Sequence, residues 1–440
     1  MSIRQIFLAC GLAAALPTLA QPAPPAAGAP ALAAAPAATS ATALTLRQAL
    51  IAARDNLDVA LSRGNLSAAR ADILSANHAP LPILSANANT IDLKNGVGSG
   101  NVVGKKRIDK FIGLDWTIER GNKRELRTAQ ARGAADAASA DVEDVQVQQL
   151  EAALGSYYDL LAAQERQQQV GEIERSATQL SASAARRVQA GDLPAQDAAR
   201  TEIETQRARA DVQQAQLDRQ RAAAALAQAM DIRTSPDSLK ADDAWPALPA
   251  TPPAPADYAL LAESRPDVRA AAARVASAQA GVDGAVALKK SDVTIGASYE
   301  HFPGVSTRLI DLRASIPLQW GYSFEGEIGR AEAALTQAQD TLVKVRRDAA
   351  LELQGLQQTA FTAEQRARSY ETEILPRARK VAEGAELAYR RGAIPLFDLL
   401  DTRRTLRATL LEAIAARTDY AKAAGMWTLR TQPALLVATP

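Results

Sequence analysis

Side chains suited to nucleophilic chemistry or metal binding are scarce in this chain of 440 residues. It contains one cysteine, Cys10, and two histidines, His78 and His301. One thiol and two imidazoles cannot by themselves supply the three or four ligands of a zinc site, and a single cysteine cannot form an internal disulfide. No Gly-x-Ser-x-Gly motif, phosphate-binding loop or cluster of metal ligands accompanies them. The sequence therefore predicts no catalytic residue, no cofactor and no metal site, and we expect a protein that is not an enzyme.

The charged residues are numerous but balanced, with 50 Lys and Arg against 49 Asp and Glu. A net charge of +1 provides no basic surface for nucleic acid, so a nucleic-acid partner is not expected. Hydrophobic residues make up 47% of the chain but aromatic residues only 4%, because most of the apolar side chains are Ala and Leu. This composition is typical of closely packed long helices.

The N-terminus has the pattern of a secretory signal peptide over residues 1–20, with Arg4, an apolar stretch and small residues that end at Ala20. Pro17 leaves the apolar stretch too short for a membrane anchor, and cleavage would remove Cys10, which lies too early for lipid attachment. We expect residues 21–43, rich in Ala and Pro, to be an unpacked leader and residues 431–440 to be a C-terminal tail.

The remaining chain consists of two copies of an internal repeat, at residues 44–232 and 257–430, joined by a Pro-rich linker at 233–256. Both copies contain Asp-Val at the start of an Ala-rich helical stretch and a glycine after their second alternating segment. Both also contain Gly-x-x-Pro followed by an aspartate, at 191–197 and 392–398. The repeat predicts two copies of one architecture.

Each copy contains two segments in which apolar and polar residues alternate, as expected for β-strands. The four strands are predicted at about 83–91, 110–118, 292–300 and 309–318. Their lengths suit tilted strands that cross a bilayer, although a half-buried strand of a soluble sheet has the same period. Four strands alone would leave open edges, so in lipid they require closure by further copies of the chain.

Long helices are predicted for the rest of each copy. Residues 122–190 contain no proline, and one continuous helix there would extend about 100 Å. Each long helix is expected to reverse at a Gly-x-x-Pro turn, at 191–194 and 392–395, and Pro376 is expected to kink the second copy. Helices of this length must pack lengthwise in coiled-coil-like layers.

Three segments in this order resemble the TolC-like outer membrane efflux family across essentially the whole mature chain. They are Arg-Pro-Asp-Val at 265–268, Pro-Leu-x-x-Gly-Tyr at 317–322, and the segment from Tyr389 to Asp401. The resemblance implies a mainly α protein with a transmembrane β part: a homotrimer whose four strands per subunit form a twelve-stranded β-barrel in the outer membrane of a Gram-negative bacterium. A coiled-coil helical tunnel would continue into the periplasm. The implied function is a passive exit duct of a tripartite efflux system, supplied by an inner-membrane pump and a periplasmic adaptor protein.

The resemblance also implies roles for residues near the two helical turns. Asp398 and Asp401 fall where some family members have a ring of carboxylates at the tunnel entrance, which would favour cations. Asp197 and Tyr389 match a pair that holds this entrance closed through a hydrogen bond between hairpins, while Ile394 stands where the family has a basic partner. The turns themselves, expected to expose apolar side chains, would dock the adaptor through Gly191, Leu193, Pro194, Gly392, Ile394 and Pro395, with Leu396 adjoining them.

Other interpretations remain open from the sequence. The outer membrane component of type I protein secretion would share the same architecture, and a soluble periplasmic coiled-coil scaffold would share the helices. The four alternating segments argue against the scaffold. For the aspartates and Tyr389, a solvated helix face is the simpler interpretation. The tip segment is slightly closer to heavy-metal ducts than to drug ducts.

Overall fold

The computed structural model describes residues 42–89, 107–233, 238–249, 256–302 and 306–432, with Lys94, Gly98, Ser99 and Ser235 as isolated positions. The expected signal peptide with Cys10, the leader up to residue 41, and the C-terminal tail from residue 433 lie outside the described residues. None of the helices in the described ranges has the length and apolar content needed to cross a membrane.

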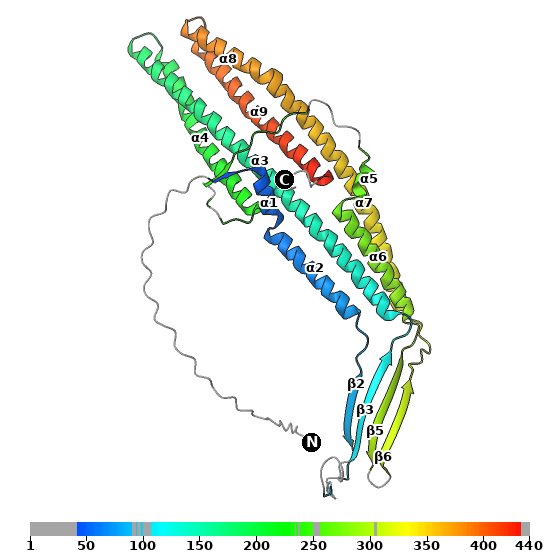
Figure 1. The fold of residues 1–440 in the computed structure, drawn as a ribbon. Helices are drawn as coiled ribbons and strands as arrows, with labels where there is room; N and C mark the ends of the chain where they lie inside the picture. Colours follow the sequence, from blue (N-terminus) through cyan, green and yellow to red (C-terminus); the bar gives the residue numbers. More distant parts are fainter. Residues whose placement is uncertain are drawn as a thin grey trace, which may run out of the picture. The chain divides into compact units, whose positions relative to one another are not determined.

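A four-stranded antiparallel sheet is formed by β2 (Ile83–Asn89), β3 (Asp109–Ile118), β5 (Val293–Phe302) and β6 (Ser306–Ser315), in the order β2-β3-β5-β6 (Figure 1). Residues 90 and 91 of the first predicted strand lie outside the described residues, and β6 begins three residues before the predicted start at residue 309. The register pairs Asp115 of β3 with Gly296 of β5, and Gly296 with Arg313 of β6. The central strands therefore come from different copies of the repeat, and the edges are β2 and β6.

The helices next to the sheet follow the same order as the strands. They are α2 (Leu57–Ala76), α3 (Lys123–Gln189), α6 (Pro266–Ala287) and α7 (Glu325–Ser369). α2 packs on α3, α3 on α6, and α6 on α7. Each helix directly precedes or follows one strand of the sheet, so the helix and strand layers share the edges α2 with β2 and α7 with β6.

Two helical hairpins complete the repeat. α3 reverses into α4 (Ala195–Ala229), and α8 (Leu375–Arg390) reverses into α9 (Leu396–Thr431), at the end of the helices opposite the sheet in Figure 1. α3 is one helix of 67 residues, whereas a π-helical turn, η2 (Tyr370–Ile374), separates α7 from α8. Pro376 lies in the first turn of α8, and because it lacks an N–H and clashes with the preceding turn, the backbone cannot continue as a regular α-helix.

A two-stranded parallel pair was not predicted from the sequence. β1 (Thr42–Leu44), at the end of the expected leader, pairs with β4 (Leu239–Ala241) from the expected linker. The short helices α1 (Leu46–Arg54) and α5 (Tyr258–Glu263) begin the two copies. A Thr45–Gln48 capping box fixes the start of α1, because each side chain bonds the other residue's backbone N–H.

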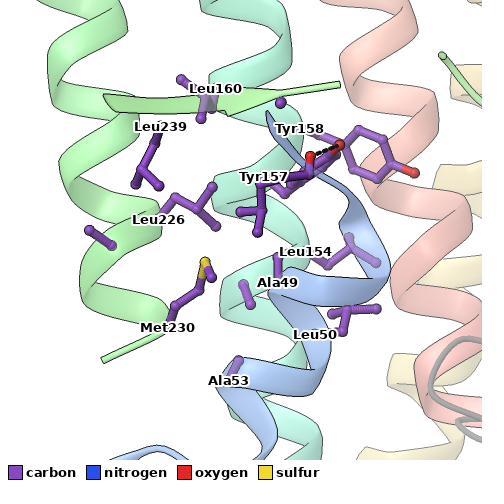
Figure 2. Packing of buried hydrophobic residues seen from close by; sticks show 14 of the residues in the cluster. Ala49, Leu50, Ala53, Leu154, Tyr157, Tyr158, Leu160, Leu226, Met230 and Leu239 are labelled. Carbon is purple, nitrogen blue, oxygen red and sulfur yellow. Dashed lines mark hydrogen bonds between the residues drawn. The ribbon is translucent and has the colours of Figure 1, made fainter. Parts of the chain in front are cut away.

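The largest group of buried apolar residues, here called the central cluster, joins β1, β4 and α1 to the long helices (Figure 2). Leu154 and Tyr157 of α3 are fully buried in it. The Tyr157 hydroxyl donates to the Asp243 carboxylate at 2.7 Å and accepts from the Asp243 N–H at 3.2 Å. Burial, together with the Asp243 carboxylate, raises the pKa of Tyr157. The remaining buried members include Leu44, Ala49, Leu50, Leu150, Leu160, Leu226, Met230, Leu239, Ala421 and Leu429.

Candidate functional site

The two hairpin turns have the same backbone geometry. At the end of α3, Gly191 has φ +81°, its N–H donates to Val188 O, and the Asp192 N–H donates to Arg187 O at 2.8 Å. At the end of α8, Gly392 has φ +71°, with matching bonds from Gly392 to Tyr389 and from Ala393 to Ala388. This is the Schellman motif, whose left-handed position favours glycine because it has no Cβ. Pro194 and Pro395 then precede α4 and α9.

The expected apolar tips are only partly exposed. Gly191, Pro194, Gly392 and Pro395 are exposed, as a docking surface requires, but Leu193 and Ile394 are half-buried. Leu396 differs from the expectation, because it is buried with Leu399 and Leu400 in a small group against which Ile394 and Tyr389 pack. The first turn of α9 is amphipathic, so its inward residue is covered while the adjacent Phe397 is 60% exposed.

The proposed gate residues have other partners within this chain. The Tyr389 hydroxyl accepts a hydrogen bond from Arg187 at 3.3 Å, and the Arg187 guanidinium lies 5.8 Å from the centre of the Tyr389 ring. Asp197 pairs with Arg200 on its own helix at 3.5 Å. In the described part of the chain, Asp197 and Tyr389 are therefore not bonded to each other. Arg187, which the sequence reasoning missed, links the α3–α4 hairpin to the α8–α9 hairpin.

Asp398 and Asp401 lie one helical turn apart at the start of α9, and both are exposed. Their spacing of three residues places them on one face of the helix. Among the described residues neither carboxylate forms an ion pair, although Asp401 acts electrostatically on Arg404. Their backbone carbonyls accept hydrogen bonds from Thr402 and Thr405. The two carboxylates are thus available to ions in solution.

Ion pairs farther from the turns also join the two hairpins. Arg404 of α9 bonds to Glu204 of α4, and Arg407 pairs with Asp211. Burial alone would raise the pKa of Glu204, but the hydrogen bond from Arg404 lowers it overall. A cavity of about 250 Å³ lies here, lined by side chains of α3, α4, α8 and α9. The hairpins therefore meet through charged side chains next to a cavity and through a small apolar contact, in which Leu180 of α3 packs against the group around Leu396.

The sheet is inverted relative to that of a soluble protein. Its apolar face, which contains Ile112, Leu114 and Trp116, is exposed, and Ile310 of β6 reaches 78% exposure. The opposite face contains the more enclosed positions, including Gly113, Gly296 and Ser298. An exposed apolar face opposite an enclosed polar face is the arrangement of strands that contact lipid on one side and water on the other.

Residues 46–231 and 258–425 match the outer membrane efflux protein family. The chain belongs to this family. The two matched ranges coincide with the two copies of the repeat, and they leave out the region of β4. The predicted membership of the TolC-like family is thereby confirmed.

Similar proteins agree with this assignment. The cobalt-zinc-cadmium resistance protein CzcC of Cupriavidus metallidurans is 25% identical over 289 residues, which are 66% of this chain and 69% of that protein. A membrane protein from Pseudomonas aeruginosa has the same fold, with a TM-score of 0.74, 17% identity, and coverage of 88% of this chain and 93% of that one. The Campylobacter jejuni CmeC outer membrane channel gives a TM-score of 0.74 at 14% identity, covering 90% and 87% of the two chains.

The protein is therefore an outer membrane efflux channel of the kind found in Gram-negative bacteria, where such channels are components of tripartite efflux systems. Membership of a channel family confirms that it is not an enzyme, and it decides against a scaffold without a channel. In the described ranges no group of three or more His, Cys, Asp or Glu side chains could hold a metal ion.

Proposed function

We propose that three copies of this chain close into a twelve-stranded β-barrel in the outer membrane, continued by a helical tunnel in the periplasm. The observation that carries the proposal is the inverted sheet with two open edges, β2 and β6. Unpaired N–H and C=O groups at an edge cannot remain unbonded in lipid, so β6 of one subunit must pair with β2 of the next.

The edge helices support the same closure. α2 carries the exposed side chains Leu57, Leu61 and Leu74, and α7 carries Val343 and Leu351. The described part of one chain leaves these apolar residues exposed, and they lie on the two helices that continue from the edge strands. Packing of α7 against α2 of the neighbouring subunit would bury them and close the helix layer in the same order as the sheet.

At the other end of the helices, we propose that the two turns bind a periplasmic adaptor protein. The adaptor would connect this channel to an inner-membrane pump. The exposed Pro194, Pro395 and Phe397 give this end an apolar surface, and the shared Schellman geometry presents two similar turns per subunit. Three subunits would present six, a surface suited to a ring of adaptor molecules.

Asp398 and Asp401 are proposed as carboxylates of the tunnel entrance, where threefold repetition would concentrate negative potential. Tyr389 is proposed to hold the entrance closed, with Arg187 as its partner within the subunit and Asp197 as its partner from a neighbouring hairpin. The similarity to a cobalt-zinc-cadmium resistance protein supports divalent metal cations as the cargo. An acidic entrance favours the same class of cargo.

Disulfide trapping tests the closure. Ala86→Cys on β2 is combined in turn with Ile310→Cys, Leu312→Cys or Ala314→Cys on β6, in the mature chain, which should retain no native cysteine. All four positions lie on the apolar face. Oxidation in the membrane should give a covalent ladder that ends at three chains for at least one pair.

The matched control combines Ala86→Cys with Ile295→Cys, which lies on the central strand β5 and would be separated from the neighbour's β2 by β6. This pair should stay uncrosslinked. A ladder that continues beyond three chains, or no crosslink for any edge pair, would overturn the closure.

The entrance is tested by replacing both Asp398 and Asp401 with Asn in planar bilayers. We expect lower cation selectivity and weaker block by divalent cations, because the fixed negative charge is removed. The double replacement of Glu371 and Glu373 by Gln removes the same charge away from the turn and should change neither property.

A further inference from the structure

An ion pair crosses the polar face of the sheet above a glycine. Arg313 of β6 donates through Nε to the Asp115 carboxylate of β3 at 2.9 Å, and a second guanidinium nitrogen bonds the other carboxylate oxygen. The two residues lie two strands apart, with Gly296 of β5 between them in register with both. A Cβ at Gly296 would lie 2.2 Å from Asp115 Oδ1 and 2.8 Å from Arg313 Nε. The pair can therefore form only because this position has no side chain.

An aromatic ring further fixes the guanidinium. The Arg313 Cζ atom lies 5.5 Å from the centre of the Phe111 ring, within the range of a cation–π interaction. The Phe111 ring in turn lies over Gly113, where a Cβ would come within 2.7 Å of it. Two glycines on neighbouring strands thus accommodate one bidentate ion pair and one aromatic ring. Arg313 is held in a single place by charge, hydrogen bonding and stacking.

Arg313 is also unusual in its charge. The alternation of the strands places Asp109, Asp115, Glu300 and Asp311 on the polar face, and among the described strand residues Arg313 is the one basic side chain there. Glu300 and Asp311 lie close enough to act electrostatically on its guanidinium. The ion pair neutralises Asp115 and places one positive charge on an otherwise acidic surface.

We propose that Arg313 is a selectivity-determining residue of the lumen at the level of the sheet, the fixed cation that limits how strongly this surface accumulates cations. This inference rests on the proposed closure of three sheets with the polar face inward. Three copies would place three guanidinium groups at one depth of the pore, each held by Asp115. The acidic lumen surface would then attract cationic cargo, but the attraction would be too weak to retain the cargo in the pore.

The test is the ratio of cation to anion permeability in planar bilayers, from reversal potentials with the dilute salt on the side of the sheet. At about 10 mM salt the screening length reaches about 30 Å, so charges on the wall act across the lumen. Arg313→Gln should raise the ratio by about twofold, and Asp115→Asn should lower it by a similar factor because it leaves the guanidinium unneutralised. Lys110→Gln, which the register of β2, β3 and β5 places on the opposite face, should leave it unchanged.

Arg313→Gln and Asp115→Asn break the same ion pair, so a purely structural effect would shift the permeability ratio in the same direction in both. Shifts in opposite directions would show that the charge of each residue is what matters. Gly296→Ala disrupts the pair by steric contact while all charges remain, so its ratio should stay close to that of the native channel. Shifts of Arg313→Gln and Asp115→Asn in the same direction, or no shift in either, would overturn the inference.

A second measurement distinguishes this failure from failure of the closure. Asn87→Cys lies on the polar face of β2 and Ala88→Cys on the apolar face, and both positions are exposed. A charged thiol reagent should change the current of the Asn87→Cys channel alone. If Asn87→Cys does not respond, the polar face does not line the pore, and both proposals fail. If it responds while the Arg313 variants show no shift, only the inference fails.

Discussion

The central cluster and the hairpin ends use the same helices but are held together in different ways. Around the central cluster, α3, α4 and α9 pack with fully buried residues such as Leu154, Tyr157 and Leu226. Arg265, 3% exposed at the start of α6, bonds Asp267 and Glu352 nearby. At the hairpin ends the apolar group around Leu396 is small, and the two hairpins meet through partly exposed pairs such as Arg404 with Glu204 next to a cavity.

The difference indicates which part of the molecule can move. Separation of helices at the central cluster would expose apolar side chains and leave charges buried without partners, which is costly. Separation of the hairpins would hydrate partly exposed ion pairs, one tyrosine hydrogen bond and the small apolar contact of Leu180, which costs less. This distribution of stability is what the proposed gate at the hairpin ends requires, because the hairpins can separate while the central cluster stays packed.

The largest effect is expected from Arg265→Gln. It removes the hydrogen bonds to Asp267 and Glu352 and leaves their carboxylates with a neutral partner, so the free energy of unfolding should fall by about 3–5 kcal/mol. Arg404→Gln is the matched variant at the hairpin ends and should cost at most about 1 kcal/mol. Denaturant titration at fixed protein and detergent concentration measures both. Equal losses would contradict the contrast between the two regions.

Leu154→Ala should cost slightly less, about 2–5 kcal/mol, because it opens a cavity in the central cluster. Leu180→Ala, half-buried near the turns, should cost clearly less in the same titration. A Cβ at Gly425 would lie 2.4 Å from Leu154 Cδ1. Gly425→Ala should therefore lower the free energy of unfolding of the native chain but raise that of the Leu154→Ala chain, because the added methyl group fills part of the cavity. If the losses of the two single variants simply add in the double variant, the two residues are not in contact.

Tyr389→Phe removes the hydrogen bond to Arg187 and should shift the balance between closed and open hairpins by about 0.5–1.5 kcal/mol, up to about tenfold in leak current. Tyr370→Phe is the control, because its hydroxyl bonds Glu412 at 2.8 Å without linking the two hairpins. Arg187→Gln and Asp197→Asn identify the partner. The replacement whose effect becomes smaller in the Tyr389→Phe background identifies the residue that the hydroxyl binds, since the contact of Arg187 with the ring remains in that background.

The smallest effect is expected in the pH dependence of stability, with opposite signs in the two regions. Burial and the neighbouring Asp267 raise the pKa of Asp144, so its contribution is present at acid pH and is lost as the pH rises through the folded pKa. The pKa of Glu204 is lowered, so its contribution is present above the unfolded pKa and is lost as the pH falls.

Relative to the native chain, Asp144→Asn should therefore become more stable as the pH rises from the acid range to neutrality, and Glu204→Gln less stable. Thermal unfolding followed by circular dichroism across this range checks the two slopes. Parallel slopes would show that the two carboxyls have similar environments.

Much of the fold follows from local patterns. The alternation in the four strands, the absence of proline from 122 to 190 and the two Gly-x-x-Pro turns are each visible within a short window of sequence. The predicted family, the mainly helical fold with a four-stranded sheet, and the outer membrane channel function are confirmed. The roles of Asp197, Tyr389, Asp398, Asp401 and the turn residues stay predictions.

The missed features depend on contacts between distant residues or on very short segments. β1 and β4 have three residues each, too few to show a period. Arg404 and Glu204 are 200 positions apart, and nothing in either local segment indicates the other. Arg187 could have been found by aligning the two turns on Gly191 and Gly392. In that alignment Arg187 is equivalent to Ala388, the residue next to Tyr389. The doubled Schellman motif thus brings these side chains to the same level.

The uninterrupted length of α3 has a mechanical consequence. From Leu154 in the central cluster to Gln189 at the turn the helix extends about 50 Å, so a tilt of about 5° at the cluster displaces its end by about 4 Å. The opposite arm contains the π-helical turn at Tyr370–Ile374, where the backbone register changes. In the proposed opening, the continuous α3 would carry a small rotation at the central cluster to its far end, whereas the π-helical turn gives the α7–α8 arm a position at which it can bend.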